Sequence, residues 1–71
     1  MKNIKQQFGD AIKKRRSELG ITQEKLAELS NLHRTYVADV ERGKRNISLE
    51  NIAKVIHALD LSLADFFKKY L

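Results

Sequence analysis

The segment from Thr22 to Gly43 constrains the fold most, because it has the pattern of two short helices joined by a tight turn. Thr22 suits the start of the first helix, since its hydroxyl can accept from an unpaired N–H of the first turn. Asn31 tolerates a left-handed backbone, and Gly43 suits the end of the second helix, where positive φ is cheap without a Cβ. The apolar residues have the spacing of two crossing helices rather than of a strand: Leu26, Ala27, Val37 and Val40.

The second helix of this segment is too polar outside Val37 and Val40 to serve packing alone. We expect its other face to be exposed, and that face carries Arg34, Thr35, Tyr36, Ala38 and Asp39. A short polar helix that is supported by another helix and rich in hydrogen-bond donors suits the major groove of double-stranded DNA. The sequence therefore predicts a helix-turn-helix that contacts DNA bases.

Three further helices are predicted around this segment, and each follows a residue that can cap its first turn, namely Asn3, Ser48 or Ser62. The first helix spans residues 3–19 and ends at Gly20. The next carries an apolar stripe of Leu49, Ile52, Val55, Ile56 and Leu59. Short links between five helices predict a compact all-α bundle. We expect one domain over residues 1–71, with the helix-turn-helix at about 22–43 and the last helix at about 62–70.

The charge of the chain favours a polyanionic partner. Lys and Arg number 14 against 9 Asp and Glu, which gives a formal net charge of +5. The basic residues are concentrated in and before the helix-turn-helix, and the early ones are Lys2, Lys5, Lys13, Lys14, Arg15 and Arg16.

No catalytic or metal-binding pattern is present in the sequence. The chain has no cysteine, which excludes a disulfide and a thiolate metal site. His33 and His57 are far apart and lack the partners of a zinc motif. We expect no cofactor, no metal and no enzymatic activity. No apolar run approaches the ~20 residues of a membrane span, so we expect a cytoplasmic protein without membrane contact. A chain this short has no room for a sensor domain, so we expect no small-molecule ligand.

One arginine of the first helix is predicted to point inward. Arg16 lies on the same side as Ile12 and Leu19, and a buried guanidinium requires a carboxylate. Glu41, at the end of the third helix, is the candidate for a structural ion pair. The alternative is that both side chains are solvated.

Several residues of the predicted DNA surface have more than one interpretation. Arg34 can donate two parallel hydrogen bonds to guanine, or it can contact a phosphate. Thr35 offers a methyl and a hydroxyl group to a base, and Tyr36 is as readily structural as functional. Asp39 repels phosphate; it can orient Arg34, accept from cytosine N4 or pair with Arg42. Gln23 begins a helix, where its side chain and the helix N-terminus together can hold a phosphate.

The last helix has more apolar surface than a small core can bury. Phe67, Tyr70 and Leu71 point partly away from the bundle, and exposed aromatic clusters of this kind mark association surfaces. We predict a homodimer through this helix. The alternative is that the bundle folds all three side chains inward.

Several motifs resemble, in order, the phage repressor/Cro-type helix-turn-helix family, whose fold is the five-helix lambda-repressor-like domain. They are Thr22-Gln23, Leu26-Ala27, Tyr36-Val37, Val40-Glu41-Arg42-Gly43, Ser48-Leu49 and Leu63 with Phe66. Within that family, the stretches at 34–36, 41–43 and 45–48 are similar to the small controller proteins of restriction–modification systems.

The resemblance implies further contacts. The second helix of the helix-turn-helix is the one expected to contact bases, and we call it the recognition helix. The resemblance implies a phosphate clamp in the loop after it, made by Lys44, Arg45, Asn46 and Ser48. His33 departs from the family pattern, which favours a good helix cap here; it contacts the DNA backbone or is merely tolerated.

The resemblance to controller proteins also implies a regulator of its own operon and of an endonuclease gene. Such a regulator activates at low occupancy and represses at high occupancy. The acidic pair Glu24 and Glu28 is a candidate contact for RNA polymerase. The alternatives are a phage-type or antitoxin-type repressor of the same fold, and an interaction module that has lost DNA binding.

Overall fold

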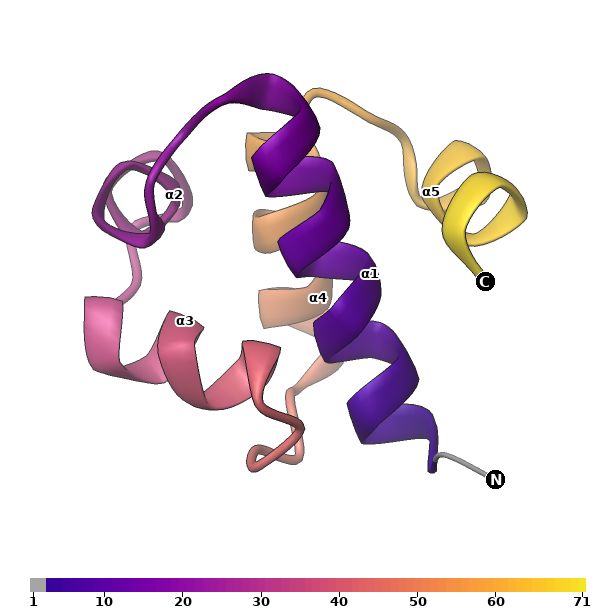
Figure 1. Cartoon of the computed structure of the whole chain (residues 1–71), viewed down its shortest axis with the longest axis horizontal. Helices are drawn as coiled ribbons and strands as arrows, with labels where there is room; N and C mark the ends of the chain where they lie inside the picture. Colours follow the sequence, from indigo (N-terminus) through magenta and orange to yellow (C-terminus); the bar gives the residue numbers. More distant parts are fainter. Residues whose placement is uncertain (1–2) are drawn as a thin grey trace.

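The structure, a computed structural model, describes residues 3–71, and this range contains five helices and no strand (Figure 1). The helices are α1 (Ile4–Leu19), α2 (Gln23–Ser30), α3 (Arg34–Glu41), α4 (Leu49–Ala58) and α5 (Leu63–Tyr70). In Figure 1, α1 crosses the middle of the view in front of α4, with α2 and α3 on one side and α5 on the other. The predicted all-α five-helix fold is confirmed. Lys2, which was counted with the early basic residues, lies outside the described residues.

The ends of the helices follow the residues expected to begin and end them. The four predicted N-caps each accept a hydrogen bond from the backbone N–H three residues later: Asn3, Thr22, Ser48 and Ser62. Asn31 closes α2 at φ 57°, in the left-handed region. Gly43 follows α3 at φ 73°, and the N–H groups of Gly43 and Lys44 bond the carbonyls of Val40 and Asp39 at 3.0 and 2.9 Å. Thr22 thus caps the start of α2, and Gly43 provides the left-handed turn after α3.

One hydrophobic core joins the helix-turn-helix to the other helices. All five helices contribute to it through Phe8, Ile12, Leu26, Val37, Val40, Val55, Ile56, Leu59 and Phe66. α3 packs against α1 and α2, while α4 packs against α2 and α5. Phe66 is fully buried and meets Phe8 edge-on, with 5.8 Å between the ring centroids. The short helix α3 is thus supported from two sides.

Gly9 sets how closely α1 and α3 approach each other. A Cβ added at Gly9 would lie 2.3 Å from the carbonyl oxygen of Val40 and 2.7 Å from that of Glu41. These are backbone atoms, so a side chain at this position would push the recognition helix away from α1. No pattern in the sequence indicated this requirement.

Three positions differ from the expectations of periodicity. Ala38, expected on the exposed face of α3, is buried, because α3 packs against two helices and its buried face is wider than one stripe. Leu49, expected in the apolar stripe, is 75% exposed, because it is the first residue of α4 and adjoins the exposed loop. His57 lies within the apolar period of α4, which predicts a packed or interface side chain, but it is exposed in the isolated chain. Within residues 3–71, no helix combines the length and the apolar character that crossing a membrane requires.

Candidate nucleic-acid interface

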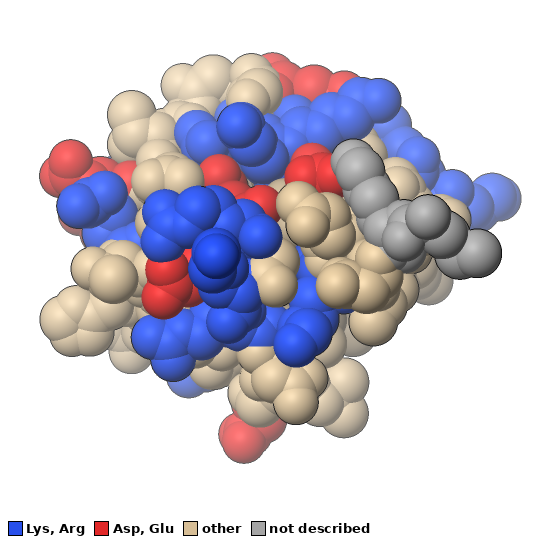
Figure 2. Space-filling model, turned by 60° about the horizontal axis from the view of Figure 1, so that its bottom comes forward, with Lys and Arg blue, Asp and Glu red and all other residues tan. Residues whose placement is uncertain are grey.

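Basic side chains gather on the side of the molecule that holds α3 and the loop after it. Figure 2 looks onto this side, and Lys and Arg side chains occupy the middle of the face with a few acidic groups among them. Arg42, Lys44 and Arg45 are exposed on these elements. The arrangement has the sign and the concentration of charge that attract the DNA backbone.

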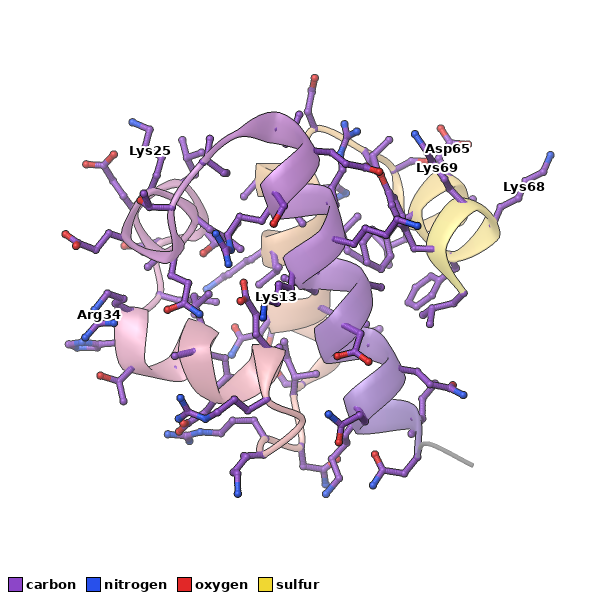
Figure 3. The ribbon with its side chains drawn as sticks, viewed as in Figure 1. Lys13, Lys25, Arg34, Asp65, Lys68 and Lys69 are labelled. Carbon is purple, nitrogen blue, oxygen red and sulfur yellow. The ribbon has the colours of Figure 1, made fainter. Side chains whose placement is uncertain are left out.

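Arg34 and Thr35 occupy the first turn of α3, and both are exposed. Figure 3 shows Arg34 pointing away from the bundle, on the opposite side of the view from Lys68 and Lys69 of α5. Within residues 3–71, Arg34 makes no hydrogen bond or ion pair. Its guanidinium therefore keeps its full set of donors for a partner outside the described chain.

Tyr36 is half-buried and held by two contacts. Its hydroxyl accepts a hydrogen bond from Asn51 Nδ2 of α4 at 3.2 Å, and the guanidinium carbon of Arg45 lies 4.9 Å from its ring centroid. The hydroxyl proton remains available to donate. The structure thus gives Tyr36 a packing role beside any contact with DNA. Asn51 was not identified from the sequence, because a polar residue in the first turn of α4 carries no distinctive signal.

Asp39 lies between two arginines. One carboxylate oxygen accepts from Arg42 on the same helix, and the other accepts from Nε of Arg45 at 3.3 Å. The pairing of Asp39 with Arg42 was one of the sequence-based interpretations, and it is present. Arg45 was expected to contact phosphate from the loop, and in the structure its side chain folds back over α3.

Arg16 and Glu41 form the ion pair that the sequence predicted. Arg16 Nε lies 2.7 Å from Glu41 Oε2 and Nη2 lies 3.1 Å from Oε1, while Nη1 donates to the carbonyl of Ile21 at 2.9 Å. The Arg16 side chain is 14% exposed and that of Glu41 is 3% exposed. The hydrogen bond to Glu41 raises the pKa of Arg16, against the opposing effect of burial. The pair joins the middle of the bundle to the end of the recognition helix.

Gln23 joins this pair from the start of α2. Its Nε2 donates to Glu41 Oε1 at 3.0 Å, so part of the amide expected to face a phosphate is turned inward. One amide hydrogen and the N-terminus of α2 are left for a phosphate contact. The link between Gln23 and Glu41 also fixes α2 relative to α3.

The other residues expected to contact phosphate lie at both ends of α3. His33, Lys44, Asn46 and Ser48 are all exposed. His33 precedes α3 without a side-chain cap bond, whereas the hydroxyl of Ser48 accepts from Asn51 N at 3.2 Å and caps α4. Among residues 3–71, no group of three or more acidic or histidine side chains is placed to hold a metal ion.

The three apolar residues of the expected dimer surface have different surroundings. Phe67 is 37% and Leu71 is 48% exposed. Tyr70 instead packs on Phe66 at 5.2 Å between ring centroids, and its hydroxyl donates to Glu18 Oε1 of α1 at 2.5 Å. This hydrogen bond lowers the pKa of Glu18. Tyr70 therefore serves chiefly to hold α5 to α1.

An apolar groove continues the exposed surface of Phe67. It has a volume of about 210 Å³ and is lined in part by Ile4, Ile47 and Ile52. Ile4 is itself 66% exposed. The apolar surface of α5 thus extends towards the start of α1 rather than along Tyr70.

Comparison with known proteins supports this arrangement. The helix-turn-helix family matches residues 12–66. The chain is 47% identical over 64 residues to control protein C.BamHI of Bacillus amyloliquefaciens, covering 89% of this chain and 79% of the relative. The crystal structure of the restriction–modification controller protein C.AhdI from Aeromonas hydrophila has a TM-score of 0.85 at 46% identity, covering 89% of this chain and 96% of that one.

A third relative was solved with DNA. The C.Esp1396I tetramer in complex with its natural 35-base-pair operator has a TM-score of 0.91 at 36% identity, covering 99% of this chain and 92% of that one. These matches cover 89–99% of this chain and 79–96% of the relatives, and the family match at residues 12–66 includes all of α2 and α3. The chain therefore belongs to the helix-turn-helix family and, within it, to the restriction–modification controller proteins.

Proposed function

We propose that this protein is a sequence-specific transcriptional regulator that binds a palindromic operator as a homodimer and controls genes of a restriction–modification system. The observation that carries the proposal is the first turn of α3, where Arg34 is exposed and its side chain makes no hydrogen bond or ion pair within residues 3–71. α1 and α2 support this helix, so the side chain is presented on a rigid element.

In this proposal the DNA bases are contacted by Arg34, Thr35 and Tyr36. The guanidinium of Arg34 donates in parallel to O6 and N7 of a guanine, which is the commonest specific contact of proteins in the major groove. Thr35 meets a thymine methyl group or a hydrogen-bonding edge. Tyr36, held by Asn51, uses its remaining hydroxyl proton at a base or at the backbone.

Backbone contacts flank this helix on both sides. Gln23 and His33 approach phosphate from the α2 side. Lys44, Arg45, Asn46 and Ser48 approach it from the loop. Contacts of this kind set the register of the protein on the duplex and supply most of the salt-dependent affinity.

The dimer forms through α5, and we infer from their exposure which residues contribute most. Phe67, Leu71 and Ile4 offer the exposed apolar area, while Tyr70 supplies mainly internal packing. Residues 1–71 act as one domain, with α5 as its association element. Two-fold symmetry then requires a palindromic site with half-sites about one helical turn apart.

Regulation comes from occupancy of the operator. We infer that the protein activates its own operon and an endonuclease gene at low concentration and represses at high concentration. Glu24 and Glu28 are exposed on α2, and Glu28 pairs with Lys25 at 2.8 Å, which leaves Glu24 as the better contact for RNA polymerase. The proposal places the protein in the cytoplasm and requires neither a cofactor, a small ligand nor a catalytic step.

Selection of bound sites from a random double-stranded DNA pool tests the proposal. We expect enrichment of a palindrome, and we expect that transcription from a promoter carrying it rises and then falls as the protein is titrated. Repression at every concentration would indicate a phage-type or antitoxin-type repressor. The absence of any enriched sequence would refute DNA recognition and would favour an interaction module.

A further inference from the structure

An acidic side chain occupies the middle of the surface that is proposed to face DNA. Asp39 lies on α3 one turn beyond Thr35, and its side chain is 23% exposed. A carboxylate at this position repels the phosphate backbone. Base reading by Arg34 does not require it.

The carboxylate of Asp39 occupies donors that a phosphate would otherwise use. One oxygen accepts from Arg42, and the other accepts from Nε of Arg45 at 3.3 Å. Carboxylates and phosphates bind guanidinium groups with the same charge-assisted, two-oxygen geometry. In the free protein, the Asp39 carboxylate therefore accepts the hydrogen bonds from Arg42 and Arg45 that a DNA phosphate could otherwise accept.

Arg45 is held from a second side as well. Its guanidinium lies over the ring of Tyr36 at 4.9 Å, and the hydroxyl of Tyr36 is bonded by Asn51 Nδ2 at 3.2 Å. The side chain is thus restrained between a carboxylate and an aromatic ring that α4 keeps in place. Its two terminal nitrogens make no hydrogen bond within residues 3–71 and remain able to donate.

We propose that Asp39 is a specificity-determining positioning residue, which restrains Arg42 and Arg45 and thereby suppresses binding to non-operator DNA more than binding to the operator. The inference rests on the proposed function, because it concerns how the same surface distinguishes one duplex from another.

The Asp39 carboxylate has different effects in complexes with non-operator DNA and in the complex with the operator. Non-specific complexes depend almost entirely on phosphate contacts, and these shift along the duplex. In such complexes Asp39 competes with phosphates for the guanidinium groups and repels any phosphate that approaches α3. On the operator, base contacts hold α3 in one register, in which Asp39 faces the groove and Arg45 reaches the backbone with its terminal nitrogens.

The test compares Asp39→Asn with Asp60→Asn. Both substitutions remove one negative charge. Asp60 is exposed in the link between α4 and α5, at the opposite end of α4 from the loop that follows α3 (Figure 1), and its φ of 63° suits asparagine. Binding of each full-length variant is measured over a range of salt concentrations. The probes are the duplex selected from the random pool and a shuffled duplex of equal length and composition. Thermal unfolding of each variant checks that it is folded.

Asp39→Asn should bind the shuffled duplex on the order of tenfold more tightly than wild type, because a like charge at the interface is removed. The ratio of selected to shuffled affinity should fall. The slope of log affinity against log salt on the shuffled duplex should become steeper by about one to two, since each released guanidinium displaces about one more counterion. Asp60→Asn should leave both the ratio and the slope near those of wild type. Asp39→Glu, which keeps the charge, should retain weak binding to the shuffled duplex.

Equal ratios and slopes for Asp39→Asn and Asp60→Asn, with a wild type that prefers the selected duplex, would overturn this inference and leave the proposed function intact. A wild type without preference for any duplex would overturn both.

Discussion

Replacing Glu41 by glutamine should destabilise the protein severely, although the two side chains have nearly the same shape. The carboxylate receives three hydrogen bonds, from Nε and Nη2 of Arg16 and from Nε2 of Gln23, at 2.7, 3.1 and 3.0 Å. An amide has one oxygen to serve these donors, and its own NH2 group adds two more donors to a crowded site. Glu41→Gln therefore leaves the Arg16 guanidinium buried without a counter-charge.

The magnitude follows from the burial of both partners. Breaking a buried ion pair by removing one member costs about 3–5 kcal/mol, and the side chains here are only 14% and 3% exposed. A 71-residue domain has a total unfolding free energy of about 4–11 kcal/mol, at roughly 0.05–0.15 kcal/mol per residue. The substitution should thus remove a large share of the stability and lower the Tm by about 12 °C or more.

Urea unfolding followed by circular dichroism measures this loss, with all variants at one protein concentration because self-association shifts apparent stability. Glu28→Gln is the matched control, since the side chains of its 2.8 Å pair with Lys25 are 70% and 53% exposed and solvent screening should leave this pair with little effect on stability. The double variant Arg16→Met with Glu41→Leu should recover part of the loss. Equal losses for Glu41→Gln and Glu28→Gln, or strictly additive effects at Arg16 and Glu41, would refute the reasoning.

Four further outcomes are expected. Arg34→Ala should cost ~1–3 kcal/mol on the operator and relax preference at one base pair per half-site. Arg45→Ala should weaken the operator and its single-base variants alike and reduce the salt slope by about one per subunit. Salt-titrated binding of both mutants to the operator and to its single-base variants distinguishes the two effects, and the opposite pattern would contradict this assignment of roles. Phe67→Ser should give a folded monomer with weak operator affinity, as sedimentation would show; a wild type that is monomeric at roughly tens of micromolar would contradict the dimer. The hydroxyl of Tyr70 lowers the pKa of Glu18 below the ordinary 4.5, so the contribution of this contact is present above pH 4.5 and is lost as pH falls through the folded-state pKa. An NMR titration should therefore find a higher midpoint for Glu18 in Tyr70→Phe, and an unchanged midpoint would exclude the hydroxyl as the cause.

Much of the fold could be predicted from local chemistry. Caps such as Thr22 and Ser48, and left-handed positions such as Asn31, act within one turn of the chain, so their effect is visible in a few consecutive residues. The inward direction of Arg16 followed from helical periodicity, which also acts locally. Periodicity was less successful for Ala38 and Leu49, because the width and the ends of a buried face depend on which helices cover it.

The candidate site also combines features that were predictable from nearby residues with features that depend on packing between helices. The choice of Arg34 and Thr35 required only their place at the start of a helix and their residue types, whereas the loop at 44–48 was chosen from the resemblance to the phage repressor/Cro-type family. The inward turn of Gln23 onto Glu41, the support of Tyr36 by Asn51 and the folding of Arg45 over α3 all join residues from different elements. No local pattern encodes such contacts.

The sequence by itself determined where the five helices begin and end, that the basic residues are concentrated in and before the helix-turn-helix, and that one guanidinium points into the bundle. Only the tertiary structure decided that α1 meets α3 at Gly9, that Tyr70 packs inward while Phe67 stays exposed, and that Asp39 holds two arginines on the recognition surface. The physical reason is the difference in range between the two kinds of interaction. Caps, turns and periodicity depend on backbone groups within a few residues, whereas these contacts depend on the distances and crossing angles at which separate helices come to rest.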